Sequence, residues 1–210
     1  MIAVVDYGLG NVQAFLHIYK KLNIPARTAS VPSDFDHCTG VILPGVGAFD
    51  WAMARLNGSE MRQCLESLVV HDEIPVLGVC VGMQMLFDES EEGSLPGLGW
   101  VAGRVRQFKA SGPLALPYPH MGWNEAVPKK EGGLFRGMEG SSRFYFLHSY
   151  YVEASRSSDV LAETSYGIDF ASAVQAGHIF GTQFHPEKSH DWGTRLLKNF
   201  AELRSCSVPE

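Results

Sequence analysis

The chain has 210 residues, of which 45% are hydrophobic and 19% charged, values typical of a globular protein and not of a disordered or fibrous one. Its formal net charge of -6 and the lack of a basic run argue against nucleic-acid binding, and no apolar stretch is long enough to span a bilayer. The four cysteines form no CxxC motif, so we expect reduced thiols in a soluble, cytoplasmic protein.

The first half of the chain alternates short apolar runs with stretches of helical spacing, which is typical of a parallel α/β sheet. The apolar runs predict strands at residues 2–5, 40–43 and 74–79. The helical spacing predicts helices at residues 12–22, 48–56, 61–70 and 82–87.

Beyond Asp88, glycines and prolines separate predicted strands at residues 100–108, 143–149, 171–175 and 178–184. A turn at Ala176-Gly177 joins the last two as a hairpin, and a helix follows at residues 191–203. The pattern predicts one α/β domain over residues 1–204, with a tail at residues 205–210. We expect an open, mostly parallel sheet flanked by helices, with an antiparallel extension.

The segment Gly78-Val79-Cys80-Val81-Gly82 lies between a predicted strand and a predicted helix, the setting of a nucleophile elbow with cysteine at its centre. The glycines on both sides lack the Cβ atoms that would collide in so tight a turn. At the start of a helix the sulfur would lie near unpaired backbone N–H groups, which favour the thiolate. We therefore predict that Cys80 is a nucleophile. Ordinary structural thiols are expected at Cys38, Cys64 and Cys206.

A thiolate that attacks an amide needs a general base and a group that orients this base. Of the eight histidines, His185 suits this role best, because it ends a predicted strand and Glu187 follows two residues later. In a strand the two side chains would point to the same side, and Pro186 restricts the backbone between them. His190 could join His185 as a metal ligand, but no HExxH motif or Cys/His cluster accompanies them, so we expect no metal site.

Leu43-Pro44-Gly45-Val46-Gly47 follows a predicted strand, which places its glycines at the carboxyl edge of the sheet beside the elbow. Its backbone N–H groups could stabilise an oxyanion, although an ordinary strand-to-helix turn has the same pattern. Gly8-Leu9-Gly10 imitates a dinucleotide fingerprint, but Gln13 occupies the third glycine position and no acid follows at the required spacing. We therefore expect no cofactor.

Together, the elbow, the Pro-Gly-Val-Gly turn and the Gln-Phe-His-Pro-Glu segment resemble the class I, or triad, glutamine amidotransferases over nearly the whole chain. Further segments are similar to the glutaminase subunits of imidazole glycerol phosphate synthases, from histidine biosynthesis. These segments are residues 6–11, 43–49, 119–124, 148–151 and 187–189.

The resemblance implies that L-glutamine forms a γ-glutamyl thioester on Cys80 and loses ammonia, with His185 as base and acid and Glu187 as its orienting group. The implied oxyanion hole consists of backbone groups of Gly45, Val46 and Val81. The implied glutamine-binding residues are Gly47, Gln84, Ser149 and Tyr150.

The resemblance also implies a heterodimer with a (β/α)₈ cyclase subunit, which receives the ammonia through a dry channel. The implied interface residues are Met121, Trp123, Asn124 and Lys188, and a buried core position is the alternative for Trp123. A histidine directly after Ser189, here His190, resembles the sequence of paralogues that feed ammonia to sugars of surface polysaccharides. A sugar-modifying partner is therefore an alternative. A non-catalytic, flavodoxin-like binding module is the alternative of another class.

Overall fold

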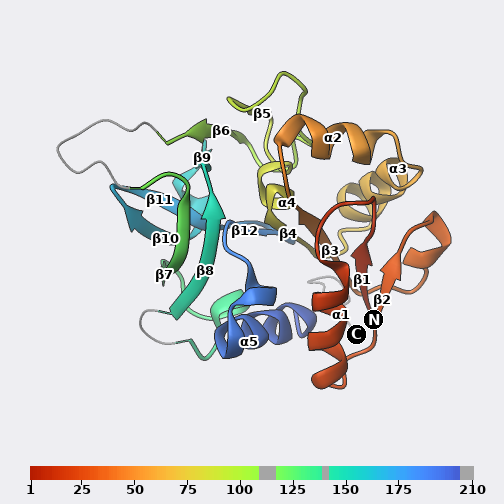
Figure 1. The fold of residues 1–210 in the computed structure, drawn as a ribbon. Coiled ribbons are helices and arrows are strands. Elements are labelled where there is room, and N and C mark those ends of the chain that lie inside the picture. The colour runs from red at the N-terminus through yellow and green to blue at the C-terminus, as the bar shows by residue number, and fades with distance from the viewer. Residues whose placement is uncertain (109–116, 139–141, 204–210) are drawn as a thin grey trace.

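The computed structural model describes residues 1–108, 117–138 and 142–203, and these residues build a 12-stranded sheet flanked by helices (Figure 1). One half of the sheet is parallel, in the order β2-β1-β3-β4-β12. Its strands are β2 (Ala26–Ala29), β1 (Ile2–Val5), β3 (Gly40–Gly45), β4 (Val76–Cys80) and β12 (Ile179–Thr182). The predicted parallel part of the sheet is confirmed, within a sheet that is mixed overall.

Helices cover both faces of the parallel half (Figure 1). On one side lie α1 (Val12–Lys21) and α5 (His190–Ala201), and on the other lie α2 (Phe49–Asn57) and α3 (Met61–Glu66). Every residue of β1, β3, β4 and β12 is therefore buried, which explains why these strands are continuous apolar runs in the sequence.

The antiparallel half continues from β12 through β11 (Ile168–Ala176), β10 (Val160–Tyr166), β7 (His120–Pro128) and β8 (Ser142–His148). A side branch pairs β5 (Glu89–Ser90), β6 (Gly103–Gln107) and β9 (Tyr150–Ala154), and β9 also pairs with β11. The predicted extension is confirmed, but β2, β5, β7, β9 and β10 were not predicted as strands. Polar residues interrupt their apolar pattern because one face or edge of each is partly exposed.

The predicted hairpin is present, with its turn one residue later than expected. Ala176 still pairs with Ile179, so Gly177 and His178 form the turn, and Gly177 takes a φ of 61° that suits glycine. The predicted helix at residues 61–70 continues from α3 into a π-helical segment, Ser67–His71. The predicted tail at residues 205–210, including Cys206, lies outside the described residues. Within the described residues, the helices are too short or too polar to cross a membrane.

The predicted helix at residues 82–87 is wrong in length, because α4 spans only Val81–Gln84. Backbone groups from the following loop take the place of further helical hydrogen bonds. Leu98 donates its N–H to the Met85 carbonyl at 2.8 Å, and Trp100 and Val101 donate to the Leu86 carbonyl at 2.9 and 3.0 Å. Partners more than ten residues away therefore end the helix, and no local pattern in the sequence reveals them.

Candidate active site

Cys80 lies at a strained turn between β4 and α4, as the elbow motif predicts. Its backbone has a φ of 57° and a ψ of -116°, a region that non-glycine residues seldom occupy. The strain is held in place because β4 is buried between β3 and β12, so the chain has no freedom to relax. The side chain is consequently presented at the carboxyl edge of the parallel sheet.

Glycines around Cys80 permit three backbone segments to touch. A Cβ atom on Gly78 would lie 2.5 Å from the Gly82 carbonyl oxygen, and one on Gly82 would lie 2.0 Å from the Leu43 carbonyl oxygen. Gly45 pairs in register with Cys80, and a Cβ atom there would lie 2.1 Å from the Gly82 nitrogen. The glycines are therefore required for close packing of the elbow against β3.

The expected contribution of the helix dipole is smaller than the sequence suggested. Because α4 has only four residues, few peptide dipoles align behind Cys80. The remaining electrostatic stabilisation comes from the first backbone N–H groups of the helix, which have no hydrogen-bond partner within it. The amide of Val81 belongs to this first turn and lies directly beside the sulfur-bearing residue.

His185 and Glu187 are in contact, but not in the way that a strand would bring them together. β12 ends at Thr182, and Pro186–Lys188 form a 3₁₀ turn, so the alternation of a strand does not apply. Pro186 begins this turn because its fixed φ suits the first helical position. Within the turn, Nδ1 of His185 lies 2.9 Å from Oε1 of Glu187, and both side chains are almost fully buried.

The electrostatic setting of His185 favours its protonated form. Burial by itself lowers the pKa of this histidine, but hydrogen bonds and charge interactions with Cys80 and Glu187 outweigh burial and raise the pKa to about 10. A protonated imidazole between two anions is the arrangement of a thiolate–imidazolium pair. These three side chains can therefore supply a nucleophile together with a proton donor.

A cavity of about 270 Å³ opens at Cys80. This volume lies just below the usual range for ligand pockets, roughly 300–1,000 Å³, and suits a small molecule. Three predicted groups of residues contribute to its wall: Cys80 and His185; Val46 and Val81; and Gly47, Gln84, Ser149 and Tyr150. Gly45, predicted as part of an oxyanion hole, does not line the cavity, because it is the last residue of β3 and packs under the elbow.

Further cavity residues were not predicted from the sequence. They are Glu92, Pro119, Leu147, His148 and Lys188, the last of which was predicted only for an interface. Glu92 accepts a hydrogen bond from the Phe49 backbone at 2.8 Å, and burial raises the pKa of its carboxyl group. Local sequence offers no signal for Glu92, because it comes from the loop after β5 and reaches the cavity only through the fold.

A family model described as glutamine amidotransferase class-I matches residues 3–203 of the chain. The chain belongs to this family. It is 56% identical over 204 residues to an imidazole glycerol phosphate synthase subunit HisH from Bdellovibrio bacteriovorus, with 97% of this chain and 100% of that protein covered. It is 47% identical, with the same coverage, to a protein of the same name from Leptospira interrogans.

Solved structures of other amidotransferases share the fold. One crystal structure of a glutamine amidotransferase matches with a TM-score of 0.72 at 19% identity, over 96% of this chain and 99% of that one. A glutamine amidotransferase from Thermotoga maritima matches with a TM-score of 0.62 at 17% identity, over 95% and 81% of the two chains. The predicted fold class is confirmed.

The face of the amidotransferase beside the cavity exposes three large apolar side chains. Met121 and Trp123 of β7 are 64% and 41% exposed, and Leu147, opposite Met121 on β8, is 38% exposed. The alternative of a buried Trp123 is therefore wrong. Its ring stacks on His190, with 5.2 Å between centroids and 6° between planes.

The two other predicted interface residues differ from each other. Lys188 is exposed, and its ammonium group lies 5.8 Å from the centre of the Tyr145 ring. Asn124 is on the opposite side of β7 from Trp123, and its amide donates hydrogen bonds to His120 and to the Ser165 carbonyl. Lys188 is therefore available to a partner, whereas the Asn124 side chain is partly buried and already bonded within the chain.

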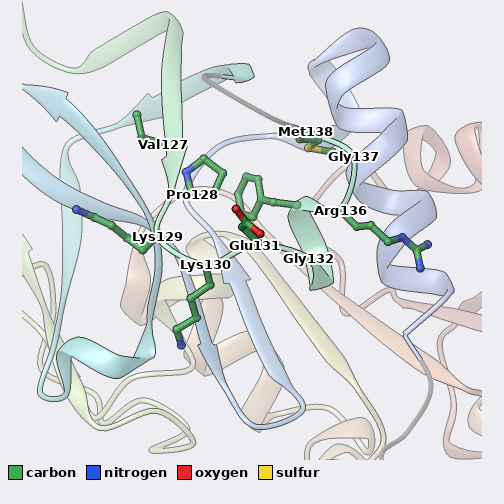
Figure 2. Close-up of a pocket in the computed structure, with 10 residues that line it drawn as sticks. Val127, Pro128, Lys129, Lys130, Glu131, Gly132, Arg136, Gly137 and Met138 are labelled. Atoms are coloured by element: carbon green, nitrogen blue, oxygen red, sulfur yellow. The ribbon is translucent and has the colours of Figure 1, made fainter.

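A larger cavity of about 730 Å³ lies away from Cys80, next to β7 and α5 (Figure 2). Its cations point apart, and each already has a partner: Lys129 pairs with Glu163, Lys130 donates to the Ser158 carbonyl, and Arg136 pairs with Glu202. They do not converge on a ligand, so we assign no chemistry to this cavity. Within the described residues, no three His, Cys, Asp or Glu side chains cluster as a metal site would need.

Proposed function

We propose that this amidotransferase is the glutaminase subunit of an imidazole glycerol phosphate synthase, and that Cys80, His185 and Glu187 hydrolyse L-glutamine to glutamate and ammonia. The observation that carries the proposal is a strained cysteine beside a buried His–Glu pair at a small cavity, in a class I amidotransferase chain. Relatives that match nearly the whole chain are named as subunits of imidazole glycerol phosphate synthase, which supports the proposal.

In the first half of the reaction, the Cys80 thiolate attacks the side-chain carbonyl carbon of glutamine and forms a carbon–sulfur bond. The carbonyl oxygen becomes an oxyanion, which backbone N–H groups of Val46 and Val81 on the cavity wall would stabilise. His185 then gives its proton to the amide nitrogen. The carbon–nitrogen bond breaks, ammonia leaves, and a γ-glutamyl thioester remains on Cys80.

In the second half, His185 takes a proton from a water molecule that attacks the thioester carbonyl. A second oxyanion forms and collapses, the carbon–sulfur bond breaks, and glutamate leaves the regenerated thiolate. Glu187 keeps Nδ1 of His185 engaged at 2.9 Å, so the other ring nitrogen faces the reacting atoms in both halves.

The cavity residues suggest how glutamine is held. Gln84, Ser149 and Tyr150 present polar groups, and Gly47 allows the backbone to approach the ligand closely. Glu92 adds a carboxylate on the same wall, which suits the ammonium group of an amino acid. The apolar lining from Val46 and Leu147 would limit the access of bulk water to the site.

The ammonia needs protection, because in water near pH 7 most of it is protonated and no longer nucleophilic. We therefore propose that a (β/α)₈ cyclase subunit binds the exposed face formed by Met121, Trp123, Leu147 and Lys188, beside the cavity. An exposed apolar patch of this kind is typical of a protein interface. The cyclase would take the ammonia directly through a dry channel.

The test uses the complex of this chain with the cyclase. We expect Cys80→Ala to abolish glutamine-dependent synthesis of imidazole glycerol phosphate and to leave synthesis from ammonium salts intact. Loss of both would mean that Cys80 supports docking or folding. A glutamine-analogue electrophile should label Cys80 in the assembled complex, and the absence of label would identify a non-catalytic binding module.

The partner is tested separately. A cognate cyclase should increase the rate of glutamine hydrolysis, whereas a sugar-modifying enzyme should not. The opposite result would assign the chain to sugar amidation, the alternative that His190 after Ser189 raises.

A further inference from the structure

Gln183 touches the sulfur of Cys80 from a fully buried position. Its Nε2 atom lies 3.9 Å from Sγ of Cys80, within hydrogen-bond distance for sulfur. Neither the sequence motif nor the proposed mechanism gives this side chain a role. A buried amide normally has a reason for its position, because its desolvation is costly unless its groups are paired.

The direction of the Gln183 amide is fixed by its neighbours. The carbonyl oxygen of Tyr150 can only accept hydrogen bonds, so the group that Gln84 places 3.3 Å from it must be the amide nitrogen. The same nitrogen lies 3.0 Å from Gln183, which must therefore offer its oxygen there. The nitrogen of Gln183 is left facing the sulfur.

The carbonyl of Tyr150 is itself held by a second donor. Nδ1 of His148 lies 2.7 Å from this oxygen, and Nε2 of His148 lies 2.9 Å from Nδ1 of His120. Burial lowers the pKa of His148 to about 3 and that of His120 to about 4, so both rings are neutral near pH 7. His148 consequently donates through Nδ1 and accepts through Nε2. The hydrogen bonds that run from His120 through His148 to the Tyr150 carbonyl therefore have only one possible donor-to-acceptor direction.

The sulfur of Cys80 also has a neighbour that disfavours the thiolate, the carbonyl group of Leu147. The carbonyl oxygen of Leu147 lies 3.9 Å from Sγ, where it accepts a hydrogen bond from the thiol but repels a thiolate. The N–H of Gln183 has the opposite preference, because it can donate to the thiolate. The balance between these two contacts affects how much thiolate is present.

We propose that Gln183 is a further catalytic residue, whose side-chain N–H stabilises the thiolate of Cys80 and whose orientation is set by Gln84 and the Tyr150 carbonyl. The inference rests on the proposed function, since it needs Cys80 to be the nucleophile. Gln84 then has two roles. Its side-chain nitrogen orients Gln183 through hydrogen bonds to Gln183 and to the Tyr150 carbonyl, and the same residue lines the cavity.

Two substitutions at position 183 separate this role from a structural one. Gln183→Met keeps the volume and removes both polar groups. Gln183→Glu keeps an oxygen that accepts from Gln84, but places a second carboxylate oxygen against the sulfur. Stabilisation of the thiolate predicts that glutamate is the more harmful replacement. A packing or scaffold role predicts that neither substitution, in folded protein, changes the pH at which the thiolate forms.

The measurement is the rate at which iodoacetamide alkylates Cys80 in the full chain, followed over pH by mass spectrometry of the peptide that contains Cys80. We expect the midpoint of the pH profile to rise by about one unit in Gln183→Met, and by more in Gln183→Glu. In the complex, kcat for glutamine hydrolysis should fall about tenfold in Gln183→Met, with KM nearly unchanged. The control is Gln175→Met, on the neighbouring strand β11, which should match the wild type in both assays.

An unchanged midpoint in folded Gln183→Met, or a smaller effect of Gln183→Glu than of Gln183→Met, would overturn the inference. If both variants fail to fold, the scaffold role is correct and the inference is wrong. A wild-type complex that neither hydrolyses glutamine nor reacts at Cys80 would instead refute the proposed function. The two failures are therefore distinguishable.

Discussion

Replacing Gly82 by alanine is the sharpest test of how the elbow is built. A Cβ atom at this position would lie 2.0 Å from the Leu43 carbonyl oxygen, whereas real Cβ atoms remain beyond 3.0 Å, so α4 and β3 must separate by about 1 Å. Both partners are backbone, and no flexible side chain can move to relieve the clash. β3 and β4 are paired in register from Val41 to Gly45, so the displacement must strain a buried ladder.

The expected cost follows from this geometry. Overpacking of a core costs about 1–3 kcal/mol, and a clash between two backbones belongs at the upper end of this range. For a chain of this size, about 3 kcal/mol lowers the Tm by about 6–12 °C. The same displacement moves the Val81 amide relative to Cys80, and a misplacement of about 1 Å reduces activity about 10²-fold.

Stability is measured by urea unfolding and activity by glutamine hydrolysis in the assembled complex. The matched control is Gly58→Ala at the end of α2, where φ is -80° and a Cβ atom would lie 3.2 Å from the Ala54 carbonyl oxygen. This control should change stability by no more than about 1 kcal/mol. If Gly82→Ala unfolded at the same urea concentration as the control, the close approach of β3 and the elbow would not be a constraint, and our reasoning would be wrong.

Three further predictions concern the surroundings of Cys80. Because the pKa of His185 is raised to about 10 from its ordinary 6.5, its contribution to stability is complete below about pH 6.5 and is lost as the pH rises toward 10; His185→Asn should remove this part of the pH dependence in urea unfolding. Glu187→Gln should reduce kcat by about 10²-fold or more, because the imidazole loses the anion that orients it; an unchanged kcat would exclude the pair from catalysis. Tyr7→Phe should destabilise the fold by about 1–3 kcal/mol, since the Pro44 carbonyl loses a buried donor at 2.7 Å, and equal urea midpoints would contradict this.

The elbow could be predicted from the sequence because its constraints are local. Two glycines around one cysteine, after a β-branched apolar run, specify a turn that few other residues can adopt, and backbone sterics act over only a few positions. The parallel strands were predictable for a related reason, since burial on both faces leaves a continuous apolar run. The pairing of His185 with Glu187 was expected too, although a 3₁₀ turn and not a strand produces it.

The sequence by itself thus determined the fold class, the position of Cys80 and the short-range pair beside it. Only the tertiary structure decided the length of α4, the exclusion of Gly45 from the cavity wall and the contact between Gln183 and Cys80. Gln183 and Cys80 are 103 positions apart, and Gln84 and Tyr150 are 66 apart. Their hydrogen bonds arise because β4 pairs with β12 and the chain returns through β9. A local pattern of residues cannot predict partners that are so distant in the sequence.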